Sequence, residues 1–145
     1  MNKVPVLIVD DSEADRYIVR RRLSKVEGFG EVMEAEDGAV FLEEFFNGAG
    51  RVQSEVLPLL VLMDVNMPGL NGFETIEELQ RRVELGKGPA SLVVMMFTSS
   101  SNPDDVAQAE NLASVRGYIT KPLDDAGIEK IRQIYHPHFS PNASV

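Results

Sequence analysis

Residues 59–72 read LLVLMDVNMPGLNG, and this stretch decides the fold that we expect. Its first five residues are apolar and lead without alternation into Asp64, a pattern typical of a strand buried on both faces of a parallel sheet. Open α/β folds place their functional sites at the carboxyl edge of such a sheet. We therefore expect Asp64 to be presented at that edge rather than buried. The alternative is an aspartate that only caps the turn at Pro68 and Gly69.

Composition narrows the possible functions. The chain has 145 residues, a length that fits one domain with a substantial core. Its formal net charge of −9 argues against a general binder of nucleic acid or of an anionic membrane. The absence of cysteine excludes disulfides, thiolate metal sites and cysteine nucleophiles. Because no signal-peptide pattern and no apolar run of membrane-spanning length occurs, we expect a cytoplasmic protein that contacts no membrane.

Four further strands and five helices are predicted around this central stretch. The other strands are expected at residues 4–9, 32–35, 92–97 and 117–120. Helices are expected after each strand, with Ser12, Asn102 and either Asp124 or Asp125 as caps. Strands that alternate with helices predict a parallel sheet with helices on both faces.

Two segments fall outside these elements. The polar, glycine-rich residues 47–55 are expected to form a surface loop. Residues 136–145, HPHFSPNASV, contain two prolines, so we expect the last helix to end before residue 136 and a tail to follow.

Polar side chains gather at the carboxyl edge of the predicted sheet. The strand ends bring together Asp10 and Asp11 from the first strand, Asp64 from the third, Thr98 from the fourth and Lys121 from the fifth. Clustered carboxylates require a cation, and oxygen ligands without His or Cys favour Mg²⁺. With a metal to neutralise an incoming phosphoryl group, Asp64 is suited to act as a nucleophile and form an aspartyl phosphate, with Thr98 and Lys121 binding its oxygens. Each residue alone has an ordinary structural role, and only their joint placement indicates function.

These motifs resemble those of response-regulator receiver domains, the family shared by the chemotaxis response regulator and other two-component signalling proteins. The resemblance covers nearly the whole chain and rests on VDDS at 9–12, EAEDG at 34–38, DVNMP at 64–68, TS at 98–99 and GYITKP at 117–122. It implies a flavodoxin-like α/β fold with a doubly wound, five-stranded parallel sheet in the order 2-1-3-4-5 and five helices. It also implies a receiver domain at 1–135 and a tail at 136–145 without an output domain. The sequence also resembles those of stand-alone receivers that serve phytochrome-type sensor kinases.

The resemblance implies a role for each acidic residue of the edge. Asp64 is implied as the phospho-acceptor. Asp11, Asp64 and the backbone carbonyl of Asn66 are implied as the protein ligands of Mg²⁺. Asp10 is implied as an outer acid that holds a metal-bound water.

The resemblance also implies a set of switch residues. Thr98 is implied as the switch hydroxyl, Lys121 as the lysine that pairs with the phosphoryl group, and Tyr118 as the switch aromatic. A half-buried tyrosine at the edge of a sheet is the plain alternative for Tyr118. The peptide bond between Lys121 and Pro122 is implied to be cis.

The function that follows is a phosphorylation switch. A sensor histidine kinase or a histidine phosphotransfer protein would donate a phosphoryl group to Asp64, and the change would remodel a surface that binds a downstream protein target. The chain could equally relay the group onward. No nucleic acid partner is expected, and the tail and last helix could support a homodimer.

Two rival classes are weighed against this function. A Mg²⁺-dependent phosphatase with an aspartate nucleophile needs a second acid shortly after Asp64, where this chain has Asn66. A flavodoxin-like cofactor binder needs a glycine-rich phosphate loop after the first strand, where this chain has Asp-Asp-Ser.

Overall fold

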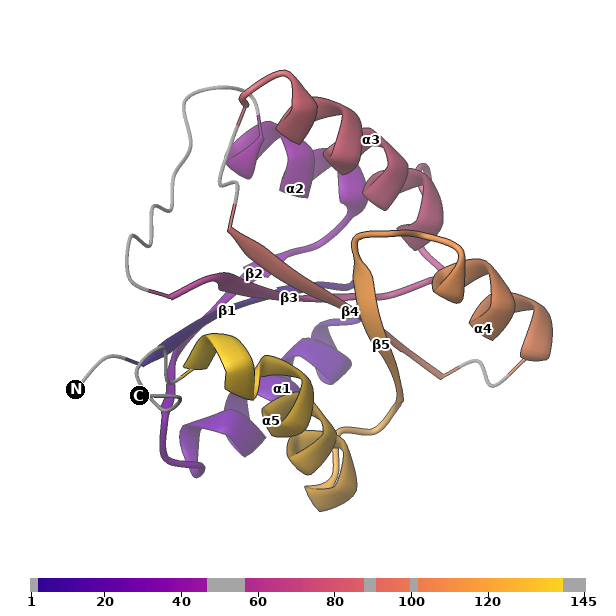
Figure 1. Cartoon of the computed structure of the whole chain (residues 1–145). Helices are drawn as coiled ribbons and strands as arrows, with labels where there is room; N and C mark the ends of the chain where they lie inside the picture. Colours follow the sequence, from indigo (N-terminus) through magenta and orange to yellow (C-terminus); the bar gives the residue numbers. More distant parts are fainter. Residues whose placement is uncertain (1–2, 47–56, 88–90, 100–101, 140–145) are drawn as a thin grey trace.

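The computed structural model describes residues 3–46, 57–87, 91–99 and 102–139. Strands and helices alternate along these residues (Figure 1), in the order β1 (Val4–Val9), α1 (Glu13–Ser24), β2 (Phe29–Ala35), α2 (Gly38–Phe45), β3 (Leu59–Met63), α3 (Gly72–Glu84), β4 (Leu92–Thr98), α4 (Pro103–Glu110), β5 (Val115–Thr120) and α5 (Asp125–Phe139). All strands pair in parallel, and their order in the sheet is β2-β1-β3-β4-β5. The predicted doubly wound sheet is thus confirmed.

Helices cover both faces of the sheet. Figure 1 shows α1 and α5 below the sheet, with α2 and α3 above it and α4 beside α3 near β5. Alternate residues of the fully buried β3 face the two layers: Leu60 and Leu62 contact the core under α1 and α5, whereas Val61 and Met63 contact the opposite core. A strand buried on both faces explains why its sequence is apolar without alternation.

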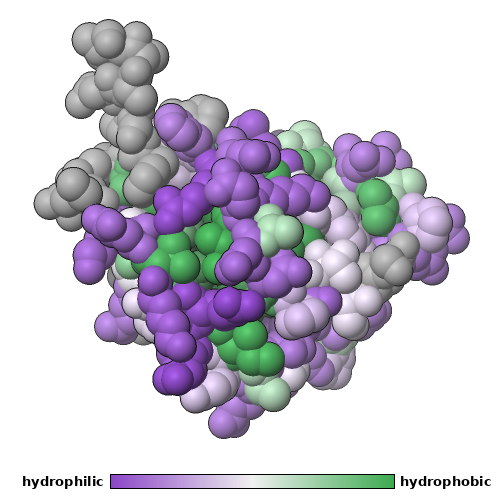
Figure 2. Space-filling model, turned by 90° about the horizontal axis from the view of Figure 1, so that it is seen from below, coloured by the Kyte–Doolittle hydropathy of each residue, from purple (hydrophilic) through white to green (hydrophobic). Residues whose placement is uncertain are grey.

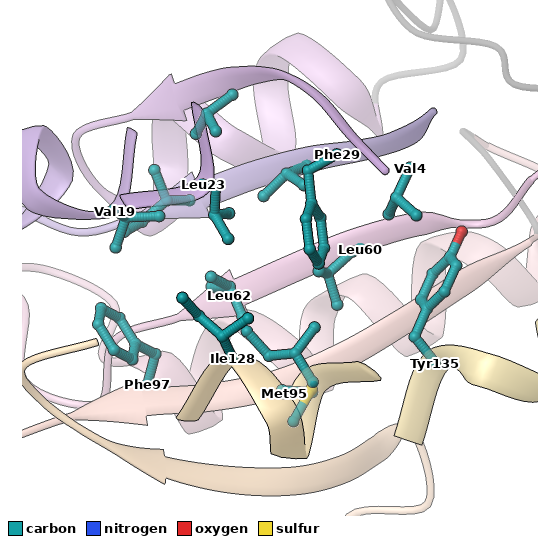
Figure 3. Packing of buried hydrophobic residues seen from close by; sticks show 14 of the residues in the cluster. Val4, Val19, Leu23, Phe29, Leu60, Leu62, Met95, Phe97, Ile128 and Tyr135 are labelled. Carbon is teal, nitrogen blue, oxygen red and sulfur yellow. The ribbon is translucent and has the colours of Figure 1, made fainter. Parts of the chain in front are cut away.

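The core below the sheet is built from strand residues and the inner sides of α1 and α5. Figure 3 shows Leu23 of α1 and Ile128 of α5 facing Leu62 and Met95 of the central strands. Tyr135 closes one end of this core, where its hydroxyl donates a hydrogen bond to the carbonyl oxygen of Pro58. On the outside of this layer, hydrophilic residues cover most of the surface, with apolar residues visible between them (Figure 2).

Side chains fix the ends of the helices as the sequence predicts. Ser12 caps α1 by accepting a hydrogen bond from the backbone N–H of Asp15, and Asp124 rather than Asp125 caps α5. Gly86, with φ of 77°, ends α3 in the left-handed conformation that glycine permits. Within the described residues, no helix has the length and apolarity needed to span a membrane.

Several predicted boundaries are wrong, among them the start of β5, which lies at Val115 rather than at residue 117. Strand β2 starts at Phe29 rather than at residue 32, because Phe29 pairs with Val4 and the β1 ladder draws the preceding residues into the sheet. Helix α5 continues through Pro137 to Phe139, although we expected a tail from residue 136. A proline removes one backbone donor, and the packing of α5 on the core outweighs that loss. The predicted loop at 47–55 lies outside the described residues.

Candidate phosphoryl site at the carboxyl edge

Asp64 lies directly after β3, at the carboxyl edge of the sheet. Its backbone N–H donates a hydrogen bond to the carbonyl oxygen of Val9 at 3.0 Å, which extends the ladder with β1. The expectation that Asp64 is presented rather than buried is wrong, because its side chain is only 7% exposed. The first residue of α3 lies against the backbone of Asp64: a Cβ on Gly72 would be 2.1 Å from the Asp64 carbonyl oxygen, so only glycine fits there.

Three carboxylates converge at this edge. Oxygen atoms of Asp10, Asp11 and Asp64 all lie within 4.8 Å of one another. Asp10 is fully buried, and its Oδ1 accepts a hydrogen bond from the backbone N–H of Ser12 at 2.9 Å. Asp11 is exposed and faces the solvent side of the cluster. The structure therefore brings the three predicted acids together.

Lys121 supplies the positive charge of the cluster. Its Nζ lies 2.6 Å from Asp10 Oδ2, 2.8 Å from Asp15 Oδ2 and 3.6 Å from Asp64 Oδ1, and the side chain is 10% exposed. Burial opposes the charged ammonium, but the close contacts with Asp10 and Asp15 and the charge of Asp64 outweigh it, so the pKa of Lys121 is raised.

The pKa of the Asp64 carboxyl group is raised toward neutral pH. Burial raises its pKa from 3.8 to about 6, and the charges of Asp10 and Asp11 add to the rise. Lys121 and a hydrogen bond from the backbone N–H of Val65 act in the opposite direction. At pH 7 the group is mainly ionised and held at an energetic cost, as a nucleophile should be.

The donor set fits a hard divalent cation. Three carboxylates (Asp10, Asp11 and Asp64) form the donor set, and a fourth, Asp15, pairs with the Lys121 ammonium, so the five groups together carry a formal charge of −3. Asp10 Oδ2 is buried and receives no directed hydrogen bond within the described residues, and its 2.6 Å contact with Lys121 is therefore an ion pair. A carboxylate oxygen left in this state is ready to accept a bond from a metal-bound water. Asn66, the implied carbonyl ligand, is exposed two residues after Asp64.

The predicted switch residues flank the cluster. Thr98 is the last residue of β4 and fully buried, and its carbonyl oxygen accepts a hydrogen bond from the Lys121 N–H at 2.8 Å. Tyr118 is half-buried on β5, and its carbonyl oxygen accepts a hydrogen bond from Lys130 Nζ at 2.6 Å. The predicted cis bond between Lys121 and Pro122 is confirmed.

Sequence reasoning missed Asp15 as a member of this cluster. An acid in the first turn of a helix is ordinarily explained by its favourable interaction with the helix dipole. A signal was available, because α1 starts at the carboxyl end of β1 and its first turn therefore borders the same edge as the strand ends.

Comparison with known proteins agrees with this site and fold. Residues 6–133 match the sequence model of the response regulator receiver domain family. The protein PilH of Pseudomonas aeruginosa is 34% identical over 86% of this chain and 91% of its own length. The chemotaxis protein CheY-3 of Vibrio cholerae is 32% identical over 93% of this chain and 95% of its own length.

A solved structure bears on the metal. The Mn²⁺-bound form of response regulator Rcp1 is 27% identical, with a TM-score of 0.63 over 98% of this chain and 96% of that one. A response regulator of the same name from Synechocystis is 31% identical over 80% of this chain and 75% of its own length.

These matches, together with the parallel sheet and the acidic edge, define a class of protein. The chain belongs to the response regulator receiver domain family, the phospho-accepting signalling modules of two-component systems. It is a signalling phosphoacceptor and not a classical enzyme, which sets aside the alternative of an aspartate-nucleophile phosphatase. Receiver domains are partnered by histidine kinases.

Proposed function

We propose that Asp64 accepts a phosphoryl group from the phosphohistidine of a sensor histidine kinase, or of a histidine phosphotransfer protein, in a Mg²⁺-dependent reaction. An Asp64 carboxylate oxygen attacks the phosphorus, a P–O bond forms as the P–N bond breaks, and the histidine nitrogen keeps the electron pair and takes a proton. The observation that carries the proposal is the position of the buried Asp64 between two further carboxylates and the Lys121 ammonium.

Each residue of the edge has a part in this reaction. Asp11, Asp64 and the Asn66 carbonyl would hold Mg²⁺, with Asp10 accepting a hydrogen bond from one of its waters. The ion would neutralise charge on the transferring phosphoryl oxygens. Lys121 would pair with those oxygens, since its Nζ already lies 3.6 Å from Asp64 Oδ1.

The output is proposed to be a change in a protein-binding surface. A phosphoryl group adds a charge of roughly −1.5 to −2 and attracts the Thr98 hydroxyl. Tyr118 would follow Thr98 inward and change the surface formed by α4, β5 and α5. Helix α4 is suited to move, because among its described side chains only Ala109 is buried. Coupling of about 1–3 kcal/mol is typical of such switches.

Several details of the proposal rest on the sequence. We propose a cytoplasmic receiver that serves a phytochrome-type sensor kinase. Binding of a downstream protein and onward relay of the phosphoryl group are both compatible with the site, and a homodimer would use the last helix. The net charge of −9 supports the absence of a nucleic acid partner.

Intact-mass spectrometry after incubation with acetyl phosphate tests the phospho-acceptor directly. We expect one added phosphoryl group that requires Mg²⁺ and is absent from Asp64→Asn. The variant Asp125→Asn serves as a matched control, because that aspartate is 98% exposed and its ion pair is with Arg22 rather than with a residue of the cluster. An adduct that persists in Asp64→Asn, or that forms equally without Mg²⁺, would refute the proposal.

A further inference from the structure

Lys121 has an acidic partner from α1 as well as those from the strand ends. Its Nζ donates a hydrogen bond to Asp15 Oδ2 at 2.8 Å, whereas Asp64 Oδ1 is 3.6 Å away. Asp10, at 2.6 Å, pairs with the same ammonium from the buried side. The lysine proposed to bind the phosphoryl group is thus held closer to Asp15 than to the proposed phospho-acceptor.

The backbone at Asp15 is firmly anchored. Its N–H donates a hydrogen bond to Oγ of the capping Ser12 at 3.2 Å. The next residue, Arg16, donates one hydrogen bond to the Asp10 carbonyl oxygen at 2.6 Å and another to Glu34 Oε1 at 2.9 Å. The Asp15 carboxylate is 32% exposed and Lys121 only 10%, so water screens their ion pair less than a pair on the open surface.

A phosphoryl group on Asp64 would compete with Asp15 for the N–H donors of the Lys121 ammonium. The ammonium has three N–H donors, and a phosphoryl group on Asp64 brings three strongly accepting oxygens. These oxygens attract the ammonium toward Asp64, whose Oδ1 lies 3.6 Å from Nζ, and away from Asp15. Because α1 is anchored at Ser12 and Arg16, Asp15 cannot follow far, and the contact with Lys121 is stretched or lost.

We propose that Asp15 is a positioning residue that restrains the Lys121 ammonium in the unphosphorylated protein and competes with the phosphoryl group for it. The inference rests on the proposed function of Asp64 as phospho-acceptor. Asp15 then sets how strongly this receiver favours its unphosphorylated state, without touching the phosphoryl group or the metal.

The test measures binding of trifluoroberyllate, a stable mimic of a phosphoryl group on a carboxylate. The full chain and its variants are titrated by calorimetry at saturating Mg²⁺. We expect Asp15→Asn to bind trifluoroberyllate roughly three- to tenfold more tightly than the wild type, as loss of a partly buried ion pair predicts. Asp15→Glu, which keeps the charge, is expected to remain close to the wild type.

Two controls separate the lysine contact from simpler effects. Glu13→Gln removes an exposed acid from the same first turn of α1, so it matches the loss of charge and of helix-dipole stabilisation, and its affinity should stay within about twofold of the wild type. In a Lys121→Gln background, Asp15→Asn should no longer tighten binding, because the shared lysine is gone.

The outcomes are distinct. If Asp15→Asn behaves like Glu13→Gln or weakens binding, or if its gain persists in Lys121→Gln, Asp15 does not act through Lys121 and the inference is overturned while Asp64 remains the acceptor. If the wild type binds no trifluoroberyllate, or Asp64→Asn binds it equally well, the proposed function itself fails, and the inference fails with it.

Discussion

Replacing Asp64 with asparagine should stabilise the metal-free protein. The folded structure raises the pKa of this carboxyl group from 3.8 to about 6, so ionisation is less favourable in the folded than in the unfolded chain. At about 1.4 kcal/mol per pKa unit, the shift of about two units corresponds to a cost of about 3 kcal/mol at pH 7.5. This shift already includes the opposing attraction of Lys121, and relaxation and water access around the site reduce the cost that is realised. We expect a net increase of about 1–2 kcal/mol in the free energy of unfolding.

The sign of the pH dependence makes this prediction specific. A carboxyl group with a raised pKa in the folded state lowers stability above pH 6, and the cost disappears below pH 4. Urea denaturation of the wild type and Asp64→Asn with a chelator present, at pH 7.5 and at pH 4, therefore measures the effect. The advantage of the variant should shrink to within about 0.5 kcal/mol at pH 4. A variant that is less stable at pH 7.5, or equally advantaged at both pH values, would contradict the reasoning.

The remaining predictions concern the metal and the packing around the site. Mg²⁺ should raise the thermal midpoint of the wild type by several degrees, as binding to the folded state alone requires, and Asp11→Asn should remove most of this shift in a calorimetric scan. Gly72→Ala should destabilise the fold by about 2–3 kcal/mol and slow modification by acetyl phosphate, because the added Cβ would collide with the Asp64 carbonyl oxygen. A stable and fully active Gly72→Ala would show that glycine is not required at this position. Arg82→Gln should cost about 1–2 kcal/mol in urea denaturation, because the guanidinium donates to two carbonyl oxygens at the end of α2, at 3.2 and 3.1 Å; an exposed control, Arg81→Gln, should change stability by less than about 0.5 kcal/mol.

The sheet and the gathering of the site could be predicted because both depend on local patterns and one rule of topology. Apolar runs that end in Asp10 and Asp64 locate β1 and β3, and parallel strands bring those ends to one edge. The turn signals at Pro68 and Gly69 also mark the break between β3 and α3. These features need no knowledge of how side chains pack.

The errors arise where tertiary contacts decide. The strand pattern predicts a presented Asp64, but the side chain is buried where Asp10 and Lys121 lie close to it, and a strand pattern cannot reveal these contacts. The contact of Asp15 with Lys121 joins residues that are 106 positions apart, so only the topological position of α1, and no local pattern, indicates it. Pro137 predicts the end of a helix when only the local sequence is considered. In α5 it follows a segment that Ile131 and Tyr135 already hold in the core, so the helix continues.

Hydrogen bonds between the region of α1 and the residues that follow β5 limit how this receiver can be redesigned. Arg22 donates a hydrogen bond to the carbonyl oxygen of Leu123 at 3.1 Å, and Arg132 of α5 donates one to the carbonyl oxygen of Glu27 at 3.0 Å. With the hydrogen bond from Lys121 to Asp15, α1 and the residues that follow it contact residues 121–132 at these three places. A chimera that takes only α1 from a related receiver would lose the hydrogen bonds made by the side chains of Asp15 and Arg22. The residues after β5 therefore have to be transferred together with α1.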